Sequence, residues 1–91
     1  MKYQLRYSSS ARHALKKLPR EVALKFVAAF QDIAEEDDDP RRRVKRLRGS
    51  GDPPFFSFRI GQYRAIMSIL DDVMVIHVIE VGQRGSVYRN V

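Results

Sequence analysis

The chain has 91 residues, which is enough for one small folded domain and too few for a second catalytic domain. It carries 17 Lys and Arg residues against 11 Asp and Glu residues, so its net charge is +6 and its pI is about 10.1. A charge balance this basic favours polyanionic partners such as nucleic acid. The hydrophobic fraction of 44% is typical of a folded protein.

The sequence contains no cysteine, so a disulfide framework, a thiolate metal site and a cysteine nucleophile are all excluded. The N-terminal segment lacks the apolar core of a signal peptide, and no apolar run approaches the roughly 18 residues of a membrane span. The acidic run Glu35–Asp39 has no turn-forming glycine and so differs from a calcium loop. We therefore expect one cytoplasmic domain, residues 1–91, with no membrane segment, metal or cofactor.

The N-terminal half reads as a strand followed by two helices. Residues 2–7 alternate between polar and apolar side chains, as a half-buried strand does. After three serines that can cap a helix, Ala11–Leu18 has apolar residues at helical spacing, and Pro19 ends this helix. A second apolar stripe over residues 22–33 predicts another helix, which ends before Pro40. The two helices would form a hairpin that covers one face of a sheet.

Three successive antiparallel strands are predicted in the C-terminal half. The first two, Phe56–Ile60 and Tyr63–Met67, are joined by Gly61-Gln62, and glycine at the first central position suits a type II′ turn. Asp71-Asp72 is the expected second turn, although aspartate matches the positive φ angles of a type I′ turn poorly. The third predicted strand is Val73–Val81.

The two-residue turn fixes the register of the first two strands. It places Arg59 opposite Arg64 on one face of the sheet; these two residues are called the arginine pair below. Two guanidinium groups that face each other directly repel and destabilise a lone hairpin. We therefore expect an anion between them, and a phosphate group fits this position.

The third strand runs back toward the arginine pair. The residues that follow it, which include Arg84 and Tyr88, are therefore brought near the pair by chain geometry. The same register places His77 opposite Ile66, on the face that carries the arginine pair. A histidine there can act as a general base or lie at the margin of the core.

A strongly basic stretch, Arg41–Arg48, precedes the strands and is called the basic segment below. Its basic residues are Arg41, Arg42, Arg43, Lys45, Arg46 and Arg48. They are suited to contact the phosphate backbone of RNA. The alternative is a solubilising surface loop that the preceding acidic run partly neutralises, and the sequence leaves both open. Residues 49–54 form a turn-rich connector into the sheet.

Three pieces of the sequence together resemble the RelE/ParE superfamily of toxins from toxin-antitoxin systems. They are Leu47-Arg48-Gly49, Phe58–Arg64, and Val81–Arg84 with the following Val87-Tyr88. Their order and spacing match the family over essentially the whole chain. The resemblance implies an α+β fold of the microbial-ribonuclease kind, β-α-α-β-β-β, with the helical hairpin packed on a small, mainly antiparallel sheet.

For the RelE branch, the resemblance implies an mRNA interferase that cleaves messenger RNA in the ribosomal decoding site. A ribose 2′ oxygen attacks the adjacent phosphate without a metal and leaves a cyclic phosphate. The arginine pair would stabilise the phosphorane, Arg84 the charge near the leaving oxygen, and Tyr88 would stack on a base or assist proton transfer. Arg48 and Lys45 match flanking RNA contacts. Fixed cations stabilise the charge that develops on phosphoryl oxygens, so the residues agree with this chemistry.

The sequence departs from the family at Ser57. RelE-type toxins often carry a basic residue there, two positions before Arg59 and on the same strand face. A serine hydroxyl accepts a proton poorly at neutral pH. Either activity is reduced, or Tyr88 or His77 takes the role of the base.

Two other functions stay open at this point. One is a toxin like the ParE branch, which binds DNA gyrase without catalysis, and Ser57 fits it. The other is a basic RNA-binding domain without nuclease activity. Either toxin branch implies an acidic, RelB-like antitoxin as the cognate protein partner, and the RelE branch adds the ribosome and mRNA.

Overall fold

The computed structural model describes residues 2–36, 39–49, 51 and 53–83. Its elements in chain order are β1 (Gln4–Tyr7), α1 (Ser9–Lys17), α2 (Arg20–Ala34), the 3-10 helix η1 (Pro40–Arg43), β2 (Lys45–Arg46), β3 (Phe56–Ile60), β4 (Tyr63–Leu70) and β5 (Val75–Gln83). The strands form one sheet in the order β1-β5-β4-β3-β2, in which only the β1–β5 pair is parallel. The predicted α+β fold is confirmed, with one short strand, β2, that was not predicted.

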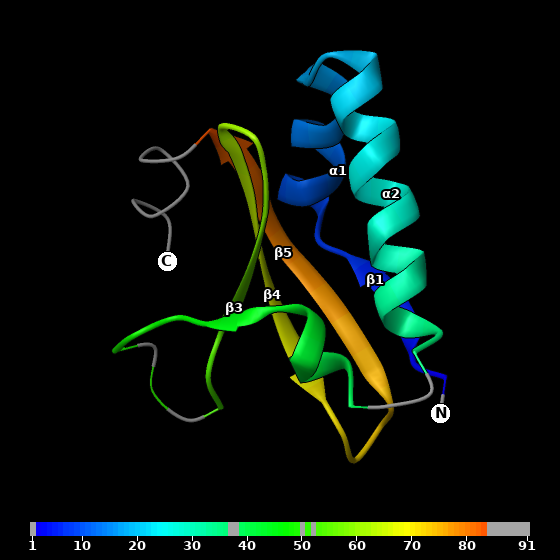
Figure 1. The fold of residues 1–91 in the computed structure, drawn as a ribbon, viewed down its shortest axis with the longest axis vertical. Helices are drawn as coiled ribbons and strands as arrows, with labels where there is room; N and C mark the ends of the chain where they lie inside the picture. The colour runs from blue at the N-terminus through cyan, green and yellow to red at the C-terminus, as the bar shows by residue number, and fades with distance from the viewer. Residues whose placement is uncertain (1, 37–38, 50, 52, 84–91) are drawn as a thin grey trace.

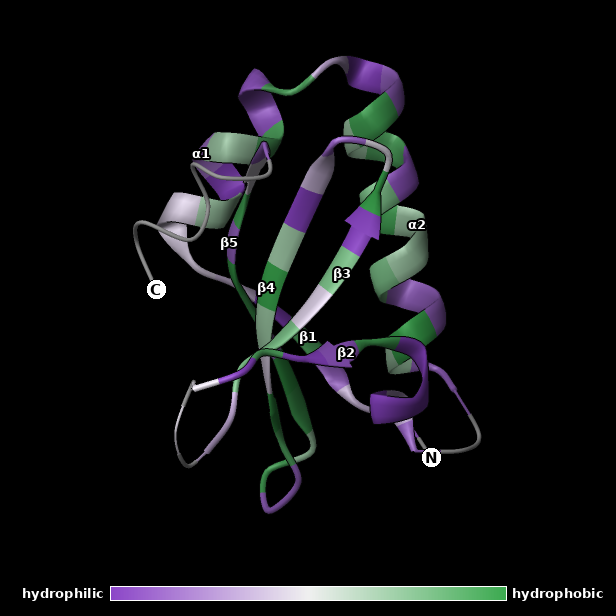
Figure 2. Cartoon of the chain, turned by 60° about the vertical axis from the view of Figure 1, so that its left-hand side comes forward, coloured by the Kyte–Doolittle hydropathy of each residue, from purple (hydrophilic) through white to green (hydrophobic). Residues whose placement is uncertain are grey.

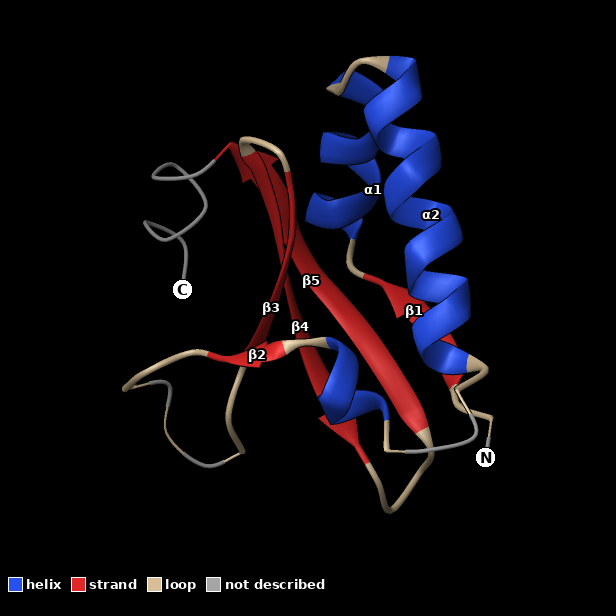
Figure 3. Ribbon diagram, viewed as in Figure 1, coloured by secondary structure: helices blue, strands red, loops and turns tan. Residues whose placement is uncertain are grey.

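The two helices lie together on one face of the sheet (Figures 1 and 3). Ser8 caps α1, because its hydroxyl accepts a hydrogen bond of 2.9 Å from the Ala11 N–H. Pro19 separates the helices as expected, and it is the N-cap residue of α2. Apolar colour runs along the sides of α2 and the central strands that face each other (Figure 2).

The core lies between α2 and the central strands. Phe26 and Phe30 of α2 are fully buried and stack on each other with their ring centroids 5.7 Å apart. Both meet Phe58 of β3 in edge-on contacts at 6.3 and 6.4 Å, a favourable geometry for aromatic rings. Met67 and Val78 from neighbouring strands are fully buried in the same cluster. This packing holds β3, β4 and β5 rigidly beneath the helices.

The hairpin of β3 and β4 has the predicted register. Ile60 pairs with Tyr63 and Arg59 pairs with Arg64, so the loop between them has two residues. Gly61 has a φ of +57°, which glycine adopts without strain, as a type II′ turn requires. The placement of the arginine pair side by side is therefore confirmed.

The second turn is longer than predicted. Leu70 pairs with Val75, so the loop has four residues, and Met74 takes a positive φ of 55°. The two-residue Asp71-Asp72 turn was wrong because aspartates do not supply the paired positive φ angles that so short a turn needs. The third strand is accordingly Val75–Gln83 and not Val73–Val81.

This longer turn and a bulge beside Ile66 and Met67 change the register of β5. His77 lies opposite Ser68, and the prediction that it lies opposite Ile66 was wrong. Ser68 is four residues from Arg64 along β4, or roughly 14 Å at 3.4 Å per residue. The end of β5 nevertheless returns as predicted, because Gly82 pairs with Arg64.

The basic segment contributes to η1 and forms β2, two elements that the sequence did not predict. Asp39 starts η1, since its carboxylate accepts a hydrogen bond of 3.0 Å from the Arg41 N–H. Strand β2 then pairs antiparallel with β3, with Lys45 opposite Ser57 and Arg46 opposite Phe56. Two residues are too few for a strand signal, so pairing with the β3 edge creates β2.

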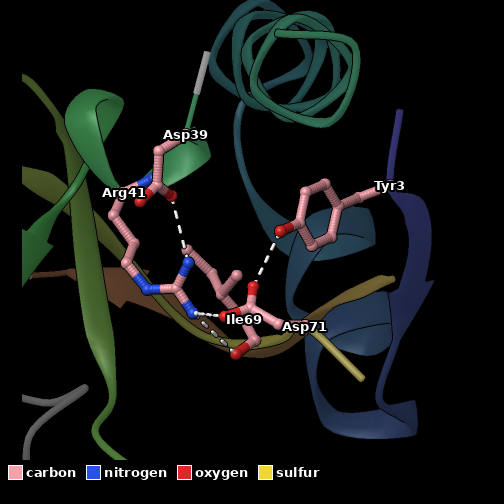
Figure 4. A network of polar contacts seen from close by, with 5 residues as sticks. All are labelled: Tyr3, Asp39, Arg41, Ile69 and Asp71. Carbon is pink, nitrogen blue, oxygen red and sulfur yellow. Dashed lines mark hydrogen bonds and ion pairs between the residues drawn. The ribbon is translucent and has the colours of Figure 1, made fainter. Parts of the chain in front are cut away.

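Arg41 and Asp71 lie at the centre of a polar network that connects η1, the β4–β5 turn and Tyr3, as Figure 4 shows. Its guanidinium donates to Asp39 at 3.0 Å and to Asp71 in the β4–β5 turn at 2.8 Å, with a longer contact to the Ile69 carbonyl at 3.5 Å. The Tyr3 hydroxyl donates to the other oxygen of Asp71 at 2.7 Å. We call these contacts the Arg41 clasp. They fix η1, and so the start of β2, against the sheet.

The clasp changes the acidity of its members. The hydrogen bond from Arg41, and after it the hydrogen bond from Tyr3, lowers the pKa of Asp71. The Asp71 hydrogen bond in turn raises the pKa of Tyr3, and it raises that of Arg41 as well. The side chain of Asp71 is 59% exposed, so solvent screens these interactions and their net stabilisation is small.

We expect Asp71→Asn to lower the free energy of unfolding at pH 7 by at most about 1 kcal/mol, the upper range for an exposed ion pair. Because the folded-state pKa of Asp71 is lowered, its contribution is present above the unfolded value of about 4 and is lost as pH falls through the folded value. Urea unfolding of the variant and wild type should therefore differ at pH 7 and converge toward pH 2.

Asp72→Asn is the matched control, because Asp72 is the adjacent exposed residue of the same turn. It should have a smaller effect at both pH values. An equal loss in the two variants would show that turn charge in general, and not the Arg41 clasp, stabilises the fold.

Candidate functional site

A basic groove of about 630 Å³ lies where the basic segment meets the β3–β4 hairpin. It is lined by Arg43, Val44, Lys45, Arg46, Leu47, Arg48, Ser57, Phe58, Arg59 and Arg64. Six of these ten lining residues are Lys or Arg and none is acidic. Such a concentration of positive charge attracts polyanions and focuses their approach.

The arginine pair forms one wall of the basic groove. Arg59 is exposed and Arg64 is half-buried, and the two lie directly opposite each other on β3 and β4. The Arg59 Nε–H donates to the Gly61 carbonyl at 3.1 Å, so the turn that sets the register also orients this guanidinium. A phosphate between the two groups would relieve their repulsion and accept hydrogen bonds from both.

The basic segment supplies the other wall, and two of its arginines, Arg41 and Arg43, form ion pairs with carboxylates. Arg41 is held in the clasp, where it also lies over the Phe56 ring at 5.8 Å. Arg43 lines the groove and forms an ion pair of 2.9 Å with Glu36.

The structure thus places four of the six predicted RNA contacts in the groove beside the arginine pair: Arg43, Lys45, Arg46 and Arg48. Arg41 and Arg42 are not among the lining residues. The sequence could not show which basic residues line the groove, because their position depends on the pairing of β2 with β3 and on the contact of Arg41 with Asp71.

A second, smaller hollow of about 280 Å³ continues from the first. It is lined by Arg59, Gly61, Gln62 and Gln83, so Arg59 borders both hollows. Gln62 and Gln83 were not predicted as site residues. The turn and the end of β5 bring their amides together, and only the pairing of Tyr63 with Gln83 reveals this.

Three other residues were predicted for the site or as its base: Arg84, Tyr88 and His77. Arg84 and Tyr88 lie outside the described residues, which end at Gln83. His77 is separated from the arginine pair by the register shift of β5, and it does not line the groove. Of the two residues considered as replacements for the missing base, His77 is therefore badly placed.

The described residues contain no group of three or more His, Asp or Glu side chains able to hold a metal ion. Within the same part of the chain, no helix is long and apolar enough to cross a membrane. What the site offers is fixed positive charge and amide donors. Such groups bind and stabilise phosphoryl oxygens.

Comparison with known proteins adds family relationships to this geometry. The model of a family described as the ParE toxin of type II toxin-antitoxin system, parDE, matches residues 5–88. Toxin RelG of Mycobacterium tuberculosis is 34% identical over 91 residues, which cover 98% of this chain and 99% of RelG. Both matches include the basic groove and the arginine pair.

Solved structures are similar over nearly the whole fold. A chain of the toxin-antitoxin complex RelBE2 from Mycobacterium tuberculosis has a TM-score of 0.75 and 32% identity, covering 92% of this chain and 93% of its own. A chain of the RelE-RelB complex from Pyrococcus horikoshii has a TM-score of 0.73 and 32% identity, covering 93% and 98%. The chain belongs to the RelE/ParE superfamily of toxins from type II toxin-antitoxin systems.

Proposed function

We propose that this toxin is a RelE-like endoribonuclease that cleaves messenger RNA at the ribosomal decoding site and so inhibits translation. The observation that carries the proposal is the arginine pair, held side by side in a groove whose lining is cationic and free of acidic residues. A fold that needed only a basic surface would not place two guanidinium groups directly opposite each other. Their position suits a phosphate that gains negative charge during reaction.

The reaction we propose is an internal transfer at phosphorus. The 2′ oxygen of the ribose forms a bond to the adjacent phosphorus, and the bond from phosphorus to the 5′ oxygen breaks with its electron pair. The 2′ hydroxyl loses its proton and the 5′ oxygen gains one, so the products are a cyclic 2′,3′-phosphate and a 5′ hydroxyl. No metal takes part in this step.

The roles follow from position. Arg59 and Arg64 would bind the non-bridging oxygens and stabilise the additional charge of the phosphorane. Arg46 and Arg48, which also line the groove, would hold the flanking backbone in register.

Arg84 and Tyr88 keep the roles that the family resemblance implies. Arg84 would stabilise charge near the leaving oxygen, and Tyr88 would stack on a base or assist proton transfer. The return of β5 to Arg64 supports this assignment, since Gly82 and Gln83 lead directly into this segment.

We also propose an acidic, RelB-like antitoxin as the physiological partner. The similar solved chains come from complexes of a toxin with its antitoxin. An antitoxin with acidic and apolar residues would complement the basic groove and would exclude RNA from it.

A gyrase-binding toxin is the second candidate function. The match to the ParE family model favours it, as does the serine at position 57. It would leave the arginine pair without a chemical task. Cleavage of ribosome-bound mRNA and inhibition of gyrase, measured on the same preparation, separate the two functions.

Replacing Arg59 tests the proposed function directly. We expect Arg59→Ala to reduce single-turnover cleavage of ribosome-bound mRNA about a hundredfold, or about 3 kcal/mol, which is typical for the loss of one preorganised charge contact to a transition state. Its stability should be unchanged or slightly raised, because the repulsion with Arg64 is removed. Cleavage rate and thermal unfolding are measured together.

The control is Arg12→Ala, which removes an equal charge from the exposed surface of α1. It should leave both quantities unchanged. A fully active Arg59 variant would contradict the catalytic role of the arginine pair and favour gyrase binding or simple RNA binding.

Arg84→Ala tests the role carried over from the family. We expect the variant to lose growth inhibition and messenger cleavage, again by about a hundredfold in rate, with stability changed by less than about 0.5 kcal/mol. Growth inhibition, single-turnover cleavage and thermal unfolding are the measurements. Normal toxicity of this variant would remove Arg84 from the site.

Salt dependence tests the second wall of the groove. The double variant Arg46→Ala/Arg48→Ala should flatten the slope of log affinity against log salt for ribosome binding by about 0.7 to 0.9 per lost phosphate contact. Arg41→Ala is the comparison, because the Arg41 clasp occupies its guanidinium. It should lower stability and leave the slope nearly unchanged; equal slopes in all three proteins would mean that the basic segment serves only solubility.

A further inference from the structure

Lys45 lies directly across the sheet from Ser57, the position at which this sequence departs from the RelE pattern. The two residues are Cα partners in the β2–β3 ladder. Residues that face each other in an antiparallel pair project from the same side of the sheet, with Cβ atoms about 4.5–5.5 Å apart. The side chains of Lys45 and Ser57 therefore lie on the same face of the sheet, and both residues line the groove.

Ser57 itself cannot supply charge to the groove. Its side chain is short and neutral, and the residue is only 7% exposed. Its hydroxyl is directed across the ladder and donates to the Lys45 carbonyl at 3.4 Å. The hydroxyl thus supports the backbone of β2 and leaves the space above it open.

Lys45 is well placed to use that space. It is exposed, and it lines the groove together with Ser57 and the arginine pair. Ser57 and Arg59 are two residues apart on β3, about 7 Å, a distance within the combined reach of a lysine and an arginine side chain. Unlike Arg41 and Arg43, Lys45 forms no ion pair with a carboxylate in the part of the chain that the structure describes.

We propose that the Lys45 ammonium takes over the catalytic position that Ser57 leaves empty, by stabilising the negative charge that develops on the attacking 2′ oxygen. The inference rests on the proposed ribonuclease function. Lys45 keeps its proton throughout: the proton of the 2′ hydroxyl passes to water as the new bond to phosphorus forms, and water protonates the departing 5′ oxygen. The contribution of Lys45 is charge held beside the reacting oxygen.

This role differs from that of a backbone contact in what it predicts. A contact made equally in the bound and transition states changes affinity and leaves the rate at saturation unaltered. A charge that acts on the reacting oxygen changes the rate at saturation. The arginines of the basic segment that line the groove, Arg43, Arg46 and Arg48, are expected to act in the first way and Lys45 in the second.

The experiment measures single-turnover cleavage of ribosome-bound mRNA at saturating toxin, and separately the affinity for the programmed ribosome. Lys45→Met, which keeps an unbranched side chain as far as Cε and removes the charged ammonium, should slow cleavage about a hundredfold with affinity changed less than about threefold. Lys45→Arg, which keeps the charge, should lie within about tenfold of wild type. Lys16→Ala on the exposed side of α1 is the charge control and should match wild type.

The decisive comparison is between Lys45→Met and a double variant in which the lysine is moved from position 45 to its cross-strand partner, position 57. Lys45→Met/Ser57→Lys places an ammonium on the partner strand of the same pair, and we expect it to recover at least tenfold of the lost rate. If thermal unfolding shows that this double variant is not folded, the comparison of Lys45→Met with Lys45→Arg decides alone.

Lys45→Met with a normal rate and weakened affinity would overturn the inference and leave Lys45 as a backbone contact. A folded double variant without recovery would overturn it too. Failure of the proposed function looks different, because the wild-type protein would then cleave no messenger and the Arg59 variant would be indistinguishable from it.

Discussion

The opposition of Arg59 and Arg64 is the constraint on which the site depends. It follows from the two-residue turn, which fixes the pairing of β3 with β4, and from Gly61, whose positive φ permits that turn. Repulsion between the two guanidinium groups works against folding, and the buried cluster of α2 and the central strands holds them in place. An anion bound between the two groups, as the proposed function requires, would relieve this repulsion.

The Arg41 clasp has a different task, which is to position the second wall of the groove. It connects η1 to the β4–β5 turn and to Tyr3, which directly precedes β1 at the opposite edge of the sheet from β2. Because η1 leads directly into β2, these contacts determine where the basic residues that follow can lie. One arginine of the basic segment thus serves structure, and residues that follow it in the chain line the groove.

The sequence predicted those parts of the fold that local chemistry determines. The helices, their proline boundary and the first hairpin follow from apolar spacing and from Gly61. The second turn failed because Asp71-Asp72 has no residue that requires positive φ, and because the bulge beside Ile66 leaves no signature in the sequence. For the same reason His77 was placed too near the arginine pair. Strand β2, and with it the place of Lys45, depends on pairing with β3, which a two-residue pattern cannot show.

The pairing of β2 with β3 also changes how the serine at position 57 bears on the proposed activity. Taken along the chain, a serine in place of a basic residue suggests a weakened enzyme or a toxin that acts by binding alone. Taken across the sheet, the same position has a lysine as its neighbour, on the same face and in the same groove. A reacting phosphate responds to the charge at a point in space and not to the strand that supplies it. Under the proposed role of Lys45, the loss of a cation at position 57 is offset by the cation at its partner position, so the unit to compare in this chain is the cross-strand pair of Lys45 and Ser57.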